Sequence, residues 1–196
     1  MNHWSMTGRN RAEGKIDDGR YDQAQDVEFV SGCCMLIRAA VLRRIGLFDE
    51  LFFMYSEDFD WCLRAAAAGI RLRYIPTALI THRVSATMDK ISRKRGHGTT
   101  SAFVVYVSAR NRFFVIRKNA RGLKKIAAIV IWLARLGYYC AAVVLLGRWE
   151  KVGALLRGVR DGLGRSVTGS LETSALRPRL RTTVGLEPAA IELKVK

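Results

Sequence analysis

The sequence predicts an α/β fold that is followed by hydrophobic and amphipathic helices. Three observations support this class. Runs rich in β-branched and aromatic residues, at 27–37 and 71–82, are typical of short strands. The alanine-rich stretch between them has the spacing of an amphipathic helix. Residues 126–146 form an apolar segment of 21 residues, close to the ~20 that a helix needs to cross a bilayer.

The first half of the chain divides into short elements. Residues 1–26 are polar and are predicted to be a loop. Residues 27–37, VEFVSGCCMLI, predict one or two short strands around Gly32. RAAVLRRIG, residues 38–46, predicts a short helix that Gly46 ends, and its basic residues suit a helix C-terminus.

The next helix is predicted over 57–69, with Ser56 as its N-cap and Gly69 at its end. Acids in its first turn are favoured by the helix dipole. The helical spacing predicts a buried face made of Phe59, Cys62, Leu63, Ala66 and Ala67. RLRYI is then predicted as a strand that Pro76 breaks, and TALITH as another short strand that ends at His82.

The second half of the chain is basic and apolar. A polar, basic loop is predicted over 83–101 and a helix over 103–119. Segment 126–146 carries one charge, Arg135, and basic clusters flank both of its ends, so the positive-inside rule gives no orientation. The segment either contacts or spans a membrane, or is a buried helix, since a central arginine is costly to insert. A helix typical of the membrane interface is then predicted, with one apolar face made of Val152, Leu155, Leu156, Val159 and Leu163.

The net charge of +16 and the pI near 10.4 predict an anionic partner. The candidates are nucleic acid, an anionic membrane surface and a phosphorylated substrate. No helix-turn-helix, zinc or RNA-recognition signature favours nucleic acid, and much of the basic excess flanks the apolar segment. We therefore expect lipid and no nucleic acid. The four cysteines lack CxxC spacing, which indicates reduced thiols in a cytosolic setting.

The candidate chemistry lies in SEDFD, residues 56–60. On a helix Asp58 and Asp60 point about 200° apart, while Asp60 and Arg64 are spaced to form an ion pair. This separates one structural acid from one free acid at the start of the helix. A carboxylate beside aromatic rings loses water and becomes a stronger base. The alternative is that these acids only complement the helix dipole.

A long stretch of the chain resembles a known family. Residues 27–82 contain the ordered pattern SG-x-x-x-L-I-R, GLFDE-x-FF-x-Y-x-ED-x-D-x-x-x-R and P-x-A-x-x-x-H, with x for any residue. This pattern resembles glycosyltransferase family 2, the inverting enzymes with a GT-A fold, and above all its rhamnosyltransferase-like branch. YVSARNRFFVIRKN, residues 106–119, and LLRGVRDGLGRS also resemble the segments that follow in that branch.

The resemblance implies roles for five residues. Asp58 would be the catalytic base, which takes a proton from an acceptor hydroxyl. Glu57, Gly32 and Trp61 would bind substrate: Glu57 would orient the acceptor, and Gly32 would let the backbone approach the sugar. His82 would join a divalent metal, Mg²⁺ or Mn²⁺, which suits the oxygens of a donor diphosphate.

One departure from the family concerns the nucleotide pocket, which the family builds from an N-terminal half with a D-x-D motif. Here IDDG, residues 16–19, has two adjacent acids but lies in a polar stretch with no apolar strand before it. The expectation is therefore the C-terminal part of such an enzyme. Its predicted regions are a polar loop (1–26), a partial GT-A-like catalytic domain (27–98), a membrane-associated helical region (99–164) and a flexible tail (165–196).

The expected function is inverting transfer of a sugar from a nucleotide-sugar donor to a cell-envelope glycan or lipid-linked acceptor. The expected location is the cytoplasmic face of the cell membrane, with 126–146 as a candidate membrane-spanning helix. The alternative is a non-catalytic, membrane-tethered fragment or binding module that lacks the donor-binding half.

Overall fold

The computed structural model describes residues 2–8, 11–12, 14–80 and 101–165. In chain order the elements are β1 (Gln25–Val27), the 3-10 turn η1 (Gly32–Cys34), α1 (Ala39–Ile45), the 3-10 turn η2 (Glu50–Phe52), α2 (Glu57–Ala67), β2 (Leu72–Tyr74), α4 (Ala102–Asn119), α5 (Gly122–Leu145) and α6 (Trp149–Gly164). The helices predicted around residues 38–46, 57–69, 103–119 and 149–163 are confirmed.

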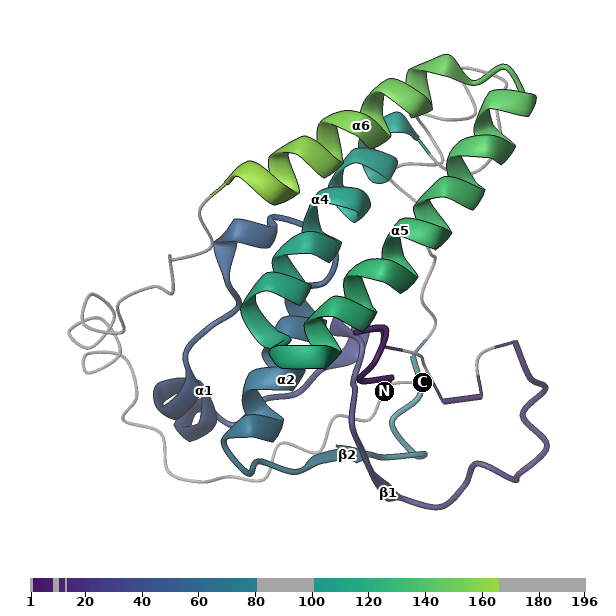
Figure 1. The fold of residues 1–196 in the computed structure, drawn as a ribbon. Coiled ribbons are helices and arrows are strands. Elements are labelled where there is room, and N and C mark those ends of the chain that lie inside the picture. The colour runs from purple at the N-terminus through teal and green to yellow at the C-terminus, as the bar shows by residue number, and fades with distance from the viewer. Residues whose placement is uncertain (1, 9–10, 13, 81–100, 166–196) are drawn as a thin grey trace.

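The molecule has two parts that meet along α4 (Figure 1). Helices α4, α5 and α6 lie side by side in one layer, and α1, α2 and the two strands lie below it. Tyr106 and Arg110 of α4 face Gly158 and Gly162 of α6 in the same order, so these two helices run in parallel. Helix α4 also contacts α2 and η2. It therefore connects the outer helical layer to the part that carries the acids.

The sheet in the described part of the chain is small. Strand β1 pairs with β2 in antiparallel register, with Asp26 opposite Arg73. The prediction of strands over 27–37 and 77–82 is wrong for most of these residues: β1 ends at Val27, and no strand forms over 77–80. The N–H groups of Gly32 and Cys34 do not bond to a neighbouring strand. That of Cys34 donates to Ser31, and that of Gly32 donates to the Asp58 side chain.

Helix α2 ends as the sequence predicts but begins differently. Gly69 has a φ of +71°, and the N–H of Ile70 donates to the carbonyl of Ala65 at 2.9 Å, which is the Schellman arrangement. Ser56 does occupy the N-cap position, yet its side chain makes no capping bond. The reason is its left-handed backbone, with a φ of +72°, whereas a capping residue is normally extended.

The buried face of α2 is rotated relative to the prediction. It consists of Phe59, Asp60, Trp61, Cys62 and Ala65, whereas Ala66 and Ala67 are exposed. Phe59 packs in a core with Phe52 and Phe114, which joins η2, α2 and α4. Met6, from the segment predicted as a polar loop, also enters this core.

Helix α6 packs on α4 through its smallest residues. A Cβ placed on Gly158 would lie 2.5 Å from the backbone oxygen of Tyr106, so the two backbones are in direct contact. Ala154 and Gly162 are buried in the same interface. The predicted apolar face of α6 is therefore wrong in part, because Leu156 and Leu163 are exposed. The prediction relied on the spacing of large apolar residues, so it missed an interface that is formed by glycine and alanine.

Helix α5 contains the apolar segment predicted at 126–146. By length and composition alone it is long and apolar enough to cross a membrane, with a mean hydropathy of 1.9. Only 11% of its most apolar stretch is buried inside the structure. Its inner side packs through Trp132, Leu136 and Tyr139 against the layer formed with α4 and α6.

Candidate active site

Asp58 lies in the first turn of α2 and is half-buried. Its Oδ2 accepts a hydrogen bond from the backbone N–H of Gly32 at 2.9 Å. Its Oδ1 accepts one from the N–H of Phe59 at 2.7 Å. Two backbone donors thus fix the carboxylate while leaving lone pairs on both oxygens. The structure brings together two residues, Gly32 and Asp58, that are 26 positions apart in the sequence.

Glu57 is the neighbour of Asp58 and is also half-buried. Burial raises the pKa of Glu57, and the nearby charge of Asp58 raises it further. Its Oε2 is buried and, within the described ranges, has no hydrogen-bond partner. An oxygen in this state gains from a ligand that supplies a hydroxyl.

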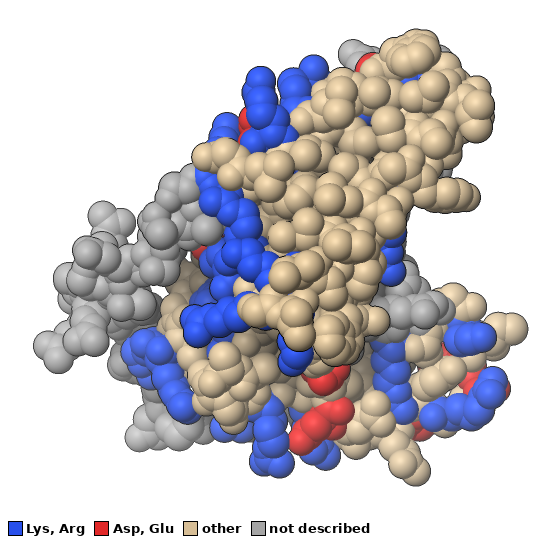
Figure 2. Space-filling view, viewed as in Figure 1, with Lys and Arg blue, Asp and Glu red and all other residues tan. Residues whose placement is uncertain are grey.

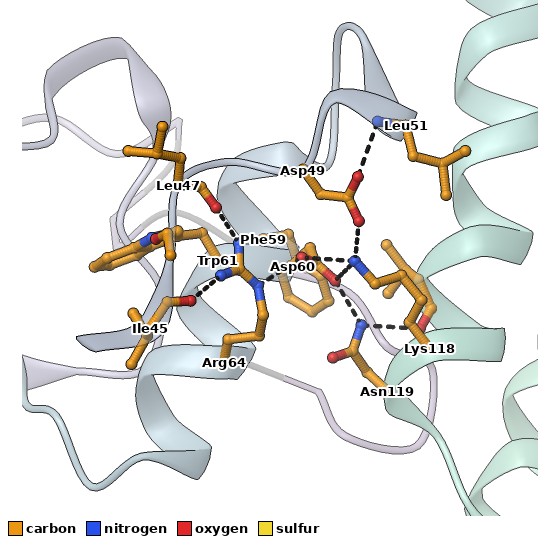
Figure 3. Close-up of polar contacts among 12 residues, drawn as sticks. Ile45, Leu47, Asp49, Leu51, Phe59, Asp60, Trp61, Arg64, Lys118 and Asn119 are labelled. Atoms are coloured by element: carbon orange, nitrogen blue, oxygen red, sulfur yellow. Dashed lines mark hydrogen bonds and ion pairs between the residues drawn. The ribbon is translucent and has the colours of Figure 1, made fainter. Parts of the chain in front are cut away.

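Asp60 faces the opposite direction and is fully buried (Figure 3). One of its oxygens accepts from Arg64 Nε at 3.0 Å, which confirms the predicted ion pair. The other accepts from Asn119 Nδ2 at 3.0 Å. Lys118 Nζ lies 3.2 Å from the same carboxylate and also binds the carboxylate of Asp49. A buried acid held by two cations and an amide is structural.

Arg64 extends this network to the loop after α1. Its two terminal nitrogens each donate to a carbonyl, those of Ile45 and Leu47, both at 2.7 Å (Figure 3). Trp61 donates its indole N–H to the carbonyl of Gly46 at 3.0 Å. Both side chains therefore fix the start of GLFDE, residues 46–50, against α2.

The backbone just before the two acids is strained. Phe53, Tyr55 and Ser56 all have positive φ, between 62° and 72°. Phe53 lies at the centre of a γ-turn of the rare form, because the N–H of Met54 donates to the carbonyl of Phe52 at 2.7 Å. Each such residue costs about 1–2 kcal/mol, so surrounding contacts must hold the turn.

Those contacts come from α4. Asn111 is fully buried, and its Nδ2 lies 2.7–2.9 Å from three carbonyl oxygens of the turn, those of Phe52, Met54 and Tyr55. Arg110 donates to the carbonyl of Phe52 at 2.8 Å and to the Asn111 side chain at 2.9 Å. Sequence reasoning missed this pair. A signal was present, because SARNRFF places polar residues within a helix whose neighbours are apolar.

Trp61 and His82 are two further residues of the predicted site. Trp61 is 2% exposed and belongs to the core, so we assign it no contact with substrate. His82 lies outside the described residues. Within the described ranges, no group of three or more His, Cys, Asp or Glu side chains could hold a metal ion. The described residues therefore supply no metal site to test against the predicted one.

A shallow hollow lies at the other end of α2. It is bounded by β1, β2 and the helix end, and its lining includes His3, Val27, Ala66 and Leu72. Asp58 is at the opposite end of α2, eight residues from Ala66, or about 12 Å along the axis. This hollow therefore does not serve the acids.

Comparison with known proteins agrees with this arrangement. Residues 9–149 match the family model described as glycosyl transferase family group 2. The chain belongs to this family. Membership in glycosyl transferase family group 2 implies a nucleotide-diphospho-sugar transferase fold. The described part of this family member is mostly helical, with a small sheet.

The relatives of the chain are sugar transferases. It is 43% identical over 56 residues to rhamnosyltransferase WbbL of Escherichia coli, which covers 29% of this chain and 21% of the relative. It is 25% identical over 153 residues to the low-salt glycan biosynthesis hexosyltransferase Agl10 of Haloferax volcanii. This match covers 78% of this chain and 44% of the relative. The N-acetylglucosaminyl-diphospho-decaprenol L-rhamnosyltransferase of Mycobacterium tuberculosis is 41% identical over 56 residues. This match covers 29% of this chain and 18% of the relative.

The chain spans less than half the length of these curated relatives. No solved structure matches it.

Proposed function

We propose that this chain carries the acceptor side of an inverting sugar transferase in which Asp58 is the catalytic base. The observation that supports the proposal most is the contrast between two neighbouring acids. Asp60 is enclosed by two cations and an amide, whereas Asp58 is half-buried and, among the described residues, is bonded to backbone N–H groups alone. Of the two, only Asp58 retains the capacity to accept a proton from a substrate.

In the proposed step, a hydroxyl oxygen of the acceptor attacks the anomeric carbon of a nucleotide-sugar. A new C–O bond forms as the bond to the nucleoside diphosphate breaks, and the hydroxyl proton moves to Asp58. Attack from the side opposite the leaving group inverts the anomeric centre. The N–H of Gly32 and the N–H of Phe59 hold the carboxylate in place during this transfer.

Glu57 is proposed to orient the acceptor. Its buried Oε2 needs a partner, and a second hydroxyl of a sugar acceptor supplies one. Because its pKa is raised, Glu57 takes up a proton more readily than an exposed glutamate and then donates a hydrogen bond. The strained turn over residues 53–56 places both acids, and Arg110 and Asn111 hold that turn.

Enzymes of this family commonly use a divalent metal, and we keep Mg²⁺ or Mn²⁺ as the proposed cofactor, with His82 as the proposed ligand. The metal would neutralise charge on the departing diphosphate. No step above depends on it, because the described residues supply no complete ligand set.

The names of the relatives suggest the substrates to try first. One relative is the dTDP-rhamnosyl transferase RfbF of Shigella flexneri, 28% identical over 106 residues, and another acts on a diphospho-decaprenol-linked sugar. We therefore propose a nucleotide-linked sugar as donor and a cell-envelope glycan or lipid-linked sugar as acceptor. The cytoplasmic face of the membrane is the proposed location, because both substrates meet there.

The experiment compares Asp58→Asn with wild type in sugar transfer by the full chain, with labelled dTDP-rhamnose and a polyprenyl-diphosphate-linked acceptor. Loss of a general base is expected to lower the rate at least about 100-fold. Asp22→Asn, a change at an exposed acid of the N-terminal segment, is the matched control and should leave the rate unchanged. Equal transfer by Asp58→Asn at equal folded concentration would refute the base assignment.

A second candidate function is a membrane-tethered module that binds without transferring sugar. The two-stranded sheet of the described part favours it, because a nucleotide pocket of this fold type needs more strands. Titration of the chain with dTDP and UDP in the presence of Mn²⁺ separates the two candidates. Saturable micromolar binding supports the enzyme, and its absence supports the module.

A further inference from the structure

Helix α5 carries a continuous exposed apolar stripe. Its members are three, four, three, five and seven residues apart, so they fall within about 140° on one side of the helix. They are Leu123, Ile126, Val130, Leu133, Tyr138 and Leu145, of which Tyr138 is 81% and Leu145 87% exposed. At 1.5 Å per residue the 24-residue helix presents this side over about 36 Å. The corresponding surface is largely free of charge in Figure 2.

The cations Lys124 and Arg135 of α5 lie beside this stripe and not at its centre. Arg135 follows Val130 by five residues, which places it about 140° around the helix. Lys124 precedes Val130 by six residues, or about 120° around. The central arginine, which would be costly at the middle of a bilayer, is exposed at the edge of the stripe, about 60° from Tyr138 around the helix. In a helix that lies flat, its long side chain can reach the headgroups.

The opposite side of α5 is held by the rest of the molecule. Ala128 is buried near the start of the helix and Val143 near its end. Between them Trp132 packs against α4, where the guanidinium of Arg112 lies over its ring at 5.5 Å. Helix α5 is thus attached lengthwise to the helical layer (Figure 1).

This attachment is incompatible with a helix that spans the bilayer. A spanning α5 would draw α4 and α6 to the same depth, together with the exposed cations Arg157 and Arg160. Insertion of such charges is costly. It would also expose to lipid the helix that binds Asp60 through Lys118 and Asn119.

The basic residues at both ends of α5 agree with the same conclusion. Arg121 and Lys124 lie at its start, and Arg148 follows its end. In a spanning helix these clusters would be on opposite sides of the membrane, against the usual bias. In a helix that lies flat, both clusters reach the headgroups of one leaflet, where each cation contributes about 1 kcal/mol with anionic lipids.

We infer that α5 lies in the plane of the membrane and docks the chain on an anionic bilayer through the stripe, without crossing it. Tyr138 and Trp149, both exposed, are residue types enriched at this depth. The inference deepens the membrane location proposed above and names the orientation and the lipid class. It does not depend on Asp58 or on sugar transfer.

The first experiment measures co-sedimentation of the full chain with vesicles of phosphatidylcholine and phosphatidylglycerol, and with phosphatidylcholine alone. Val130→Asp is expected to weaken binding to the anionic vesicles about tenfold, since it removes one apolar anchor and adds a like charge. Leu36→Asp is the matched control, because Leu36 is 96% exposed but lies outside α5. It should bind as wild type does, and circular dichroism should show equal helix content in all three proteins.

The second experiment measures depth. With Cys33, Cys34 and Cys140 replaced by Ser, a fluorophore is placed in turn at 126, 133 and 145. Cys62 stays, because it is buried and its pKa is raised to about 11, so it resists labelling. Quenching by lipids brominated at known depths should give three similar, shallow depths. Positions 126 and 145 are about 28 Å apart along the axis, so a spanning helix would place them in opposite leaflets.

The outcomes are separable. Three shallow depths together with the Val130→Asp defect support the inference. A deep label at 133 between two shallow ones overturns the orientation while leaving the membrane location intact. Absence of vesicle binding, with the stripe instead covered by a second copy in sedimentation equilibrium, overturns both, and neither result bears on the assignment of Asp58.

Discussion

The side-chain amide of Asn111 lies 2.7 Å from the carbonyl oxygen of Tyr55, two residues before Glu57. This contact joins α4 to the strained turn from which α2 begins. Asn111 has two amide protons, and three carbonyls of the turn share them. The position of both proposed site acids therefore depends on a residue that lies more than fifty positions further along the chain.

Asn111→Ala is expected to lower the free energy of unfolding by about 2–4 kcal/mol, because the carbonyls of Met54 and Tyr55 lose the donor that Asn111 supplies. Urea unfolding followed by tryptophan fluorescence measures this loss. In conditions where the variant stays folded, kcat should fall more than KM rises, since the turn that carries Asp58 is released. Ser108→Ala, at an exposed position of the same helix, should change neither quantity. Wild-type stability in Asn111→Ala would contradict the role of these bonds.

Gly158→Ala is expected to destabilise the chain by about 3 kcal/mol or more, because the new Cβ would lie 2.5 Å from the backbone oxygen of Tyr106. Gly153→Ala is a matched change on the same helix. There the nearest atom is the end of the Arg157 side chain at 3.5 Å, so the higher helix propensity of Ala should add up to about 1 kcal/mol. Thermal unfolding of both variants tests the pair. Equal melting temperatures would show that α6 is not packed as described.

Gly32→Pro is expected to slow sugar transfer about tenfold. Proline has no N–H, so the variant loses the 2.9 Å hydrogen bond to Asp58, and bonds to charged groups contribute about 1.5–3 kcal/mol. The proline Cδ takes the place of the amide hydrogen, so the Asp58 carboxylate must also move away from this position. The turn itself should tolerate the change, because Gly32 begins a 3-10 turn after an extended Ser31.

Gly32→Ala keeps the N–H, and its Cβ would lie 3.4 Å from that of Asp58, an ordinary contact. It should therefore transfer sugar close to the wild-type rate. If both variants were equally active, the hydrogen bond would have no part in the reaction.

Glu57→Gln is expected to raise the free energy of unfolding at neutral pH. The pKa of Glu57 is raised in the folded chain by burial and by Asp58, above its ordinary value of 4.5. The unfolded chain therefore loses this proton at lower pH than the folded one, and stability falls as pH rises above 4.5. Glutamine does not titrate, so the variant should gain over wild type between acid and neutral pH and match it in acid. A difference that is independent of pH would rule out this titration.

The sequence predicted the helices better than the strands. Local signals such as Gly46 and Gly69 end α1 and α2 where expected, because positive φ at those positions needs glycine. The strand predicted at RLRYI is confirmed as β2, but the predictions over 27–37 and 77–80 are wrong, because a strand needs a partner. Beyond Val27 the apolar run at 27–37 has no neighbouring strand in the described part of the chain, and the N–H of Gly32 bonds to a side chain instead.

Helical geometry alone was enough to distinguish the structural acid, Asp60, from the candidate base, Asp58. The i, i+4 spacing from Asp60 to Arg64 predicted the ion pair that is found, and it separated Asp60 from Asp58. The supports from Lys118, Asn119 and Asn111 could not be predicted, since they cross from α4 to residues about sixty positions away. Trp61, which lies beside the acids in the sequence, was predicted to bind substrate, but its side chain is buried in the core.

The close approach at Gly158 has a mechanical consequence. At Gly158 the backbones of α4 and α6 touch, so at this point no flexible side chain lies between the two helices to absorb a displacement. A displacement of α6 is therefore passed directly to α4. Asn111 of α4 binds the carbonyls just before Asp58, so the displacement would also reach the proposed catalytic carboxylate.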